Sequence, residues 1–133
     1  MLLGIFLLSF GYRYGLPEGF DVVLDLRSLP VPSLKWSLKG LTGLDPVVRS
    51  TVLGSKKCQA LLERCRKKIE GTMIGRPLDA EQQVTIAVGC GGGRHRAVVV
   101  AEELRKKLKA DGFKVTPQHR DIRKHLWGIL DRT

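Results

Sequence analysis

Short runs of apolar and β-branched residues recur along this chain of 133 residues. They predict four strands, at about 2–9, 21–26, 84–89 and 113–117. The first run is apolar at almost every position, which fits a strand buried on both faces of a parallel sheet. It is too short to span a bilayer, which needs about 20 residues, and it lacks the basic start of a signal peptide.

Apolar positions with helical spacing predict helices between these strands. Asp45 and Pro46 suit the N-cap and first position of a helix, and Ser55 suits the N-cap of a longer one. The longer helix carries bases opposite an apolar stripe of Cys58, Leu61, Leu62, Cys65 and Ile69. A helix that begins near residue 94 and ends at Gly112 buries Val98, Ala101, Leu104 and Leu108.

Alternation of strands and helices predicts an α/β fold: one domain over residues 1–133, with a mainly parallel sheet and helices on both faces. This is a three-layer sandwich. Ligands bind such sheets at the carboxyl ends of the strands. We therefore expect a pocket at that edge, with candidate lining residues Ser9, Arg13, Asp25, Arg27, His119 and Arg120, and with Thr42 and Asp45 from the loop before a helix.

A glycine-rich turn joins the strand at 84–89 to the helix that follows it. Gly91, Gly92 and Gly93 are succeeded by Arg94, His95 and Arg96. A helix N-terminus presents free N–H groups and partial positive charge, and glycines let a ligand approach the main chain. Arginine adds charge-assisted hydrogen bonds. The turn therefore predicts an anion site, in which Gly91, Gly92, Gly93, His95 and Arg96 would hold phosphate.

The net charge of +10 is concentrated in two segments. Residues 49–76 carry eight bases and two acids, and residues 94–133 carry eleven bases and five acids. Such a field favours polyanions, although solvated basic helix faces explain it equally well. If RNA is a partner, we expect it to contact the basic side chains Lys67, Lys68, Lys106, Lys107, Arg123 and Lys124.

Three cysteines, Cys58, Cys65 and Cys90, are too few for a disulfide framework, so we expect a reducing, cytoplasmic setting. We expect no metal site, because the three histidines stand far apart and none pairs with a cysteine motif. Cys90 and Arg96 do fit Cys-x5-Arg, the loop of cysteine-dependent phosphatases, in which a thiolate attacks phosphorus. Ala97 stands where those enzymes usually have Ser or Thr.

Five segments together resemble one known family: SFGYRYGLP (9–17), DLRSLPVP (25–32), LTGLDP (41–46), TIAVGCGGGRHRAV (85–98) and HRD (119–121). In this order they are similar to the C-terminal domain of the RNase adapter protein RapZ and its relatives. Full-length relatives also carry an N-terminal P-loop domain. No G-x-x-x-x-G-K-[ST] motif occurs here, so we expect a stand-alone version of the second domain.

The resemblance implies a phosphofructokinase-like α/β domain without an established catalytic role or cofactor. It further implies binding of an amino-sugar phosphate (glucosamine 6-phosphate) and of small regulatory RNA, and assembly into a dimer or tetramer. Carried over by position, the phosphate turn falls on Gly92, Gly93, His95 and Arg96, and the sugar-facing acid and base fall on Asp25 and Arg27.

Several positions depart from the family pattern. Gly91 and Ala97 replace a Thr and a Ser, which removes two hydroxyl donors from the turn. Val31, Ser33 and residues 81–83 also differ. From the resemblance and the glycine turn together, we expect a non-catalytic, regulatory domain that binds a phosphorylated metabolite and has no membrane partner. Two alternatives stay open. These are a phosphatase that uses Cys90 and Arg96, and a basic module that binds RNA alone.

Overall fold

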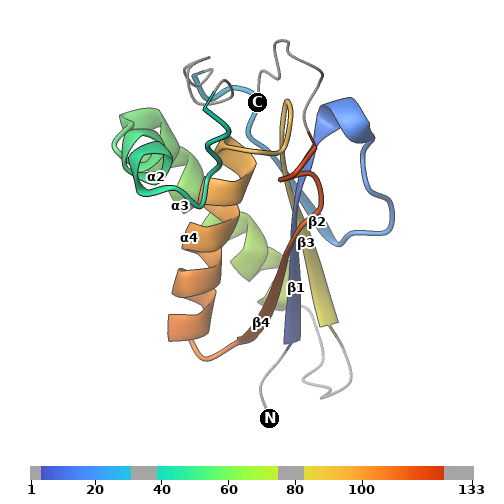
Figure 1. Ribbon diagram of the computed structural model, residues 1–133. Coiled ribbons are helices and arrows are strands. Elements are labelled where there is room, and N and C mark those ends of the chain that lie inside the picture. Colours follow the sequence, from blue (N-terminus) through green and yellow to red (C-terminus); the bar gives the residue numbers. More distant parts are fainter. Residues whose placement is uncertain (1–3, 31–38, 75–82, 125–133) are drawn as a thin grey trace.

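The structure, a computed structural model, describes residues 4–30, 39–74 and 83–124. Its sheet has four parallel strands in the order β2-β3-β1-β4 (Figure 1). They are β1 (Gly4–Gly11), β2 (Val22–Asp25), β3 (Gln83–Cys90) and β4 (Lys114–His119). The predicted α/β class and the four predicted strands are confirmed. Residues 2–3 of the first predicted strand, and Val31, Ser33 and residues 81–82 among the family departures, lie outside the described residues.

In the described part of the chain, three α-helices cover one face of the sheet: α2 (Pro46–Leu53), α3 (Lys56–Ile74) and α4 (Arg96–Ala110) (Figure 1). The segment from the short 3-10 helix η1 (Tyr12–Tyr14) to β2 lies on the other side, drawn in blue. This segment forms the third layer. The expected α-helices on both faces are therefore not found among the described residues.

The strand order explains this arrangement. The connections β2–α3–β3 and β3–α4–β4 both step across the sheet in the same direction. Because crossovers between parallel strands are right-handed, both place their helices on the same face. The connection from β1 to β2 steps in the opposite direction and so falls on the other face.

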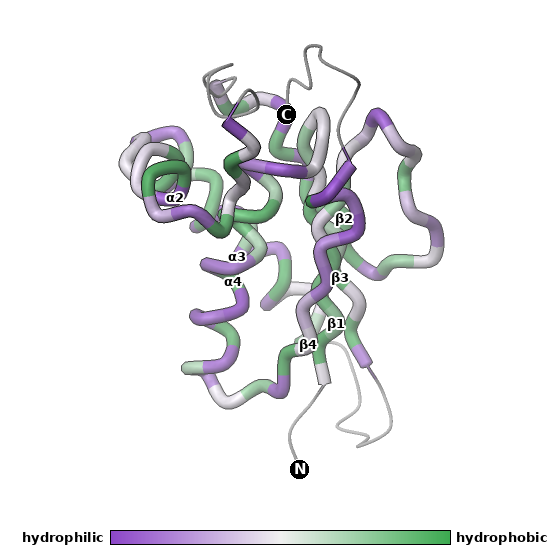
Figure 2. The backbone as a smooth tube through the Cα atoms, viewed as in Figure 1, coloured by the Kyte–Doolittle hydropathy of each residue, from purple (hydrophilic) through white to green (hydrophobic). Residues whose placement is uncertain are grey.

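The main core lies between the helices and the sheet. Alternate residues of the strands, such as Leu7, Leu24 and Ile86, are buried against the helices. The predicted stripe of α3 from Cys58 to Ile69 is buried there as well. In Figure 2, hydrophobic and hydrophilic positions alternate along α4, as expected for a helix with one buried side. On the opposite face, the rings of Phe6 and Phe20 stack with their centroids 6.0 Å apart.

The predicted helix boundaries hold, with one difference in detail. Ser55 Oγ accepts a hydrogen bond from the Cys58 N–H at 3.3 Å, and Gly112, with a φ of 99°, follows the end of α4. Asp45 and Pro46 occupy the expected positions at the start of α2. The Asp45 carboxylate, however, accepts the Thr42 N–H at 2.7 Å instead of capping the helix.

Candidate functional site

The glycine turn lies at the carboxyl edge of the sheet, between Cys90 at the end of β3 and Arg96 at the start of α4. Its backbone packs directly on the end of β1. A Cβ atom on Gly93 would lie 2.5 Å from the Gly11 nitrogen, and one on Gly11 would lie 2.3 Å from the Gly92 carbonyl carbon. Gly93 also has a φ of 79°. The glycines therefore allow two backbone segments to touch where no side chain fits.

The sulfur of Cys90 lies inside the turn. The N–H groups of Gly93 and Ala97 each donate a hydrogen bond to Cys90 Sγ, at 3.3 Å. The thiol is fully buried, and this burial raises its pKa despite those hydrogen bonds and the nearby charge of Arg96. Two N–H groups near the start of α4 are thus directed at a protein sulfur, a partner that the sequence does not predict.

His95 joins the turn to the loop before α2. Its Nε2 lies 2.7 Å from the Leu41 carbonyl oxygen, and burial lowers the pKa of this histidine to about 4. At neutral pH the ring is therefore uncharged and Nε2–H donates to Leu41. The loop packs closely on the turn, because the Gly43 N–H donates to the Arg94 carbonyl at 2.8 Å. The Nε2–H tautomer of His95 is assigned from its contact with the Leu41 carbonyl.

Arg96 brings a buried positive charge to the same place. It is 4 % exposed, and its NH1 donates to the Leu29 carbonyl at 2.8 Å. Burial lowers its pKa, and the attraction of Cys90 and Asp25 opposes that shift without cancelling it. Arg94 is buried to the same extent. Two guanidinium groups and the N-terminus of α4 thus concentrate positive charge around the turn.

Asp25 and Arg27 form an exposed pair beside the turn. Arg27 NH2 donates to Asp25 Oδ2 at 2.7 Å, and this hydrogen bonding is the main reason why the pKa of Asp25 is lowered. The Arg27 guanidinium also lies 3.8 Å above the ring of Tyr12. The Leu26 N–H donates to the Gly89 carbonyl at 2.8 Å, which keeps this end of β2 next to the turn.

Hydrogen bonds and ion pairs of residues 119–121 connect the ends of β1 and β4. Asp121 is fully buried, and its Oδ2 accepts the Gly11 N–H at 2.8 Å. Arg120 donates to Asp121 and to the Gly15 carbonyl at 2.7 Å, and Lys124 Nζ lies 2.7 Å from Asp121 Oδ1. Asp121 is not among the pocket residues that the sequence predicts, although it directly follows two of them, His119 and Arg120.

Ser9 and His119 bind each other in the structure. Ser9 Oγ lies 2.6 Å from His119 Nδ1, and His119 Nε2 lies 2.8 Å from Glu102 Oε2 on α4. Arg105 donates to the other oxygen of Glu102 at 3.0 Å. Ser9 is fully buried within β1, so its hydroxyl is inaccessible to a substrate. This chain of hydrogen bonds therefore braces β1, β4 and α4.

The structure places the predicted pocket residues at one edge of the sheet, but it gives many of them protein partners. Arg13, whose side chain is exposed, donates its N–H to the Gly91 carbonyl at 3.1 Å. Thr42 and Asp45 bond to each other within the loop that covers His95. Within residues 91–96, Gly91 alone is partly exposed, and the other five residues are buried.

Four of the candidate RNA-binding residues lie on α3 and α4, away from this turn. The other two, Arg123 and Lys124, lie in the segment after β4. Exposed side chains belong to Lys67 and Lys68 on α3, Lys106 on α4, and Arg123 and Lys124, whereas Lys107 is half-buried. Across residues 4–30, 39–74 and 83–124, no group of three potential metal ligands is found. No helix in the same ranges has the length and apolarity needed to cross a membrane.

Comparison with known proteins gives the same family as the sequence motifs. Residues 3–123 match the RapZ C-terminal domain family. The chain is 42% identical over 117 residues to a nucleotide-binding protein of Limosilactobacillus reuteri, covering 88% of this chain and 40% of that protein. It is 39% identical over 122 residues to a nucleotide-binding protein of Syntrophotalea carbinolica, covering 92% of this chain and 42% of that protein.

These curated relatives are thus much longer than the matched region, and this chain spans about 40% of their length. The match nevertheless includes the glycine turn, the Asp25–Arg27 pair and residues 119–121, all of which lie within residues 3–123. The chain belongs to the RapZ C-terminal domain family.

Proposed function

We propose that this domain binds the phosphate group of a small metabolite, of the amino-sugar phosphate type, at the turn of residues 91–96 and acts as a non-catalytic regulatory domain. The observation that carries this proposal is the convergence of two buried arginines, Arg94 and Arg96, with the glycine turn at the N-terminus of α4. Such an arrangement of positive charge and main-chain N–H groups favours an anion.

The surrounding residues suit such a ligand. Phosphate would approach from the side of Gly91 and be held by Arg96 and by main-chain N–H groups of the turn. Asp25 and Arg27 flank this place and are exposed, so they can bind the amine or hydroxyl groups of a sugar. Gly91 and Ala97 provide no hydroxyl, which leaves the main chain and the arginines as the phosphate donors.

Chemical-shift mapping on the unaltered protein tests the location. We expect inorganic phosphate and glucosamine 6-phosphate to shift the amide signals of residues 91–96, and the sugar phosphate to shift those of Asp25 and Arg27 as well. Arg96→Ala should abolish stabilisation by phosphate in thermal unfolding. The control Arg66→Ala removes a partly exposed arginine of α3 that pairs with Glu63 and Glu70, and it should leave that stabilisation unchanged. Shifts confined to another surface would contradict the proposal.

A cysteine-dependent phosphatase is the second candidate, because one observation favours it. Loop N–H groups donate to Cys90 Sγ, and Arg96 hydrogen-bonds to the same thiol, as a phosphatase loop requires. Full burial opposes it, since it raises the pKa of the thiol and closes the sulfur to solvent. Turnover of para-nitrophenyl phosphate that Cys90→Ser abolishes would establish this activity. We expect no turnover.

RNA is proposed as a further partner of the basic surfaces on α3 and α4, on the strength of charge alone. Within residues 4–30, 39–74 and 83–124, the exposed lysines Lys67, Lys68 and Lys106 form no bond to an acidic side chain, so they are available to phosphates. Because these lysines lie away from the glycine turn, RNA binding would largely survive the substitution Arg96→Ala.

A further inference from the structure

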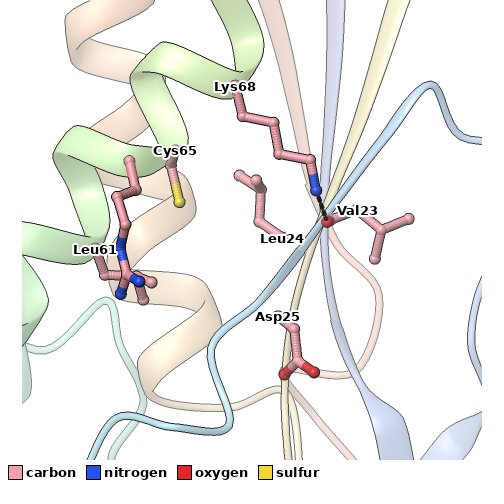
Figure 3. Close-up of a pocket in the computed structure, with 7 residues that line it drawn as sticks. Val23, Leu24, Asp25, Leu61, Cys65 and Lys68 are labelled. Carbon is pink, nitrogen blue, oxygen red and sulfur yellow. Dashed lines mark hydrogen bonds between the residues drawn. The ribbon is translucent and has the colours of Figure 1, made fainter.

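A hollow lies between the edge strand β2 and helix α3 (Figure 3). It has a volume of about 230 Å³. Its walls include the apolar side chains of Leu24, Leu61 and Cys65, each no more than 9 % exposed. Burial raises the pKa of the Cys65 thiol to about 11, so this wall is uncharged at neutral pH. We call this hollow the β2–α3 groove.

Two cations line the β2–α3 groove from successive turns of α3. Arg64 and Lys68 are four residues apart, so their side chains lie on the same side of the helix. Lys68 Nζ reaches across to the Val23 carbonyl at 3.2 Å, as the dashed line in Figure 3 shows. Arg64 forms no ion pair with another described residue. A phosphate would bind Lys68 more strongly than this neutral carbonyl does, because its hydrogen bonds are charge-assisted at both ends.

Asp25 connects the groove to the glycine turn. Asp25 lines the groove at the carboxyl end of β2, where its carboxylate is held by Arg27, and its backbone is paired with Gly89, next to the turn. Along β2, Val23, whose carbonyl Lys68 contacts, lies about 7 Å from Asp25. Asp25 therefore lies between two groups of cations: Arg27 and Arg96 near the turn, and Arg64 and Lys68 on the α3 side of the groove.

We propose that the β2–α3 groove is a second anionic subsite, and that the preferred ligand of this domain is an elongated metabolite with two phosphate groups. This inference rests on the proposed function, because the first phosphate occupies the turn. The second phosphate binds Arg64 and Lys68, while the hydroxyl groups between the two face Asp25. An added peptide strand fits this edge less well, because β2 is short and Lys68 covers its outer carbonyl.

Calorimetric titration with glucose 6-phosphate and glucose 1,6-bisphosphate tests the second subsite. We expect the bisphosphate to bind the unaltered domain at least about tenfold more tightly, a difference of 1.4 kcal/mol. The double variant Arg64→Gln/Lys68→Gln should bind both ligands with the affinity of the monophosphate. The matched control Lys56→Gln/Lys57→Gln removes the same charge from exposed positions of α3 outside the groove, and it should keep the preference.

The outcomes separate the two proposals. Equal affinity of the unaltered domain for both ligands, or loss of the preference in the control as well, would overturn the second subsite and leave phosphate binding at the turn intact. If neither ligand nor inorganic phosphate binds, the proposed function itself fails. Thermal unfolding of each variant without ligand shows that the fold is retained, which is expected because all four side chains are exposed.

Discussion

At the scale of single residues, the shape of the glycine turn depends on close backbone packing and on buried hydrogen bonds. Gly93 combines a φ of 79° with a close approach to the backbone of Gly11. His95 is buried and neutral against the Leu41 carbonyl. Cys90 accepts hydrogen bonds from two backbone groups of the same turn. These residues hold the shape of the turn, and Arg96 supplies its charge.

Gly93→Ala should lower the free energy of unfolding by about 2–4 kcal/mol, because it adds strain at a positive φ and a clash with Gly11. Urea denaturation measures the change. Gly71→Ala is the matched control: Gly71 lies within α3, and a Cβ atom there would have no neighbour within 4 Å, so this change should stabilise the domain by about 0.5–1 kcal/mol. Equal effects of the two substitutions would refute the packing argument.

His95 should make stability depend on pH in a defined window. Its pKa falls from 6.5 to about 4 on folding. Between these two pH values, the histidine is therefore largely protonated in the unfolded chain and largely neutral in the folded domain. Stability is complete above pH 6.5 and decreases as the pH falls toward 4, by about 1.4 kcal/mol per pH unit. Between pH 6.5 and pH 5 we expect a loss of about 2 kcal/mol in urea denaturation.

The variant His95→Gln keeps a donor for the Leu41 carbonyl and has no proton to gain. Its stability should therefore change less than that of the unaltered domain across the same pH window. The lowered pKa values of Asp25 and Asp121 act at lower pH, where they also reduce stability as the carboxylates become protonated. An unchanged pH profile in His95→Gln would show that another group controls this window.

At the scale of the elements, the carboxyl edge is held together by contacts between the end of one strand and the start of the next segment. Asp121 follows β4 and accepts the N–H of Gly11, the last residue of β1. Gly11 packs on the glycine turn, and Arg13 bonds to Gly91. Residues 119–121 thus position the turn through the end of β1.

Asp121→Ala should destabilise the domain by about 3–5 kcal/mol, because it leaves a buried N–H and two cations without their carboxylate. Asp121→Asn keeps an acceptor for Gly11 and should cost less. Glu63→Ala, at an exposed position of α3, serves as the control and should change stability by no more than about 0.5 kcal/mol. Chemical denaturation compares the three; a cost for Asp121→Ala as small as the control's would disprove the role.

At the scale of the whole molecule, charge and topology distinguish two regions of the domain. The carboxyl edge of the sheet carries the turn and the Asp25–Arg27 pair, and the helical layer carries most exposed lysines. Since α3 and α4 cover the same face of the sheet, their basic residues contribute to one side of the protein (Figure 1). This is the side where a polyanion would be attracted.

If RNA binds there, its affinity should fall steeply with salt and show weak sequence preference. Replacing Lys67, Lys68, Lys106 and Lys107 together with Gln should weaken binding of several unrelated RNAs to the same degree. The slope of log affinity against log salt should decrease by about 0.7 for each phosphate of a single strand that the variant no longer neutralises. Arg96→Ala should have a smaller effect. Affinity that is independent of salt in filter binding or fluorescence anisotropy would rule this mode out.

Much of the architecture follows from the sequence by itself. The β-branched runs predict β1, β2, β3 and β4, and the stripe from Cys58 to Ile69 predicts the buried side of α3. Ser55 and Gly112 mark helix ends. These features are local: hydrophobic spacing, caps and turns act over a few residues, so a short window of sequence contains the information that determines them.

Only the tertiary structure decided which partners the polar and charged groups of the site have. Strand order placed α2, α3 and α4 on one face, because right-handed connections in one direction share a side. Folding also directed His95 at Leu41, a residue 54 positions earlier, and Asp121 at Gly11, a residue 110 positions earlier. Such contacts join segments that are distant in sequence, and no local pattern of polar residues specifies which buried donor meets which acceptor.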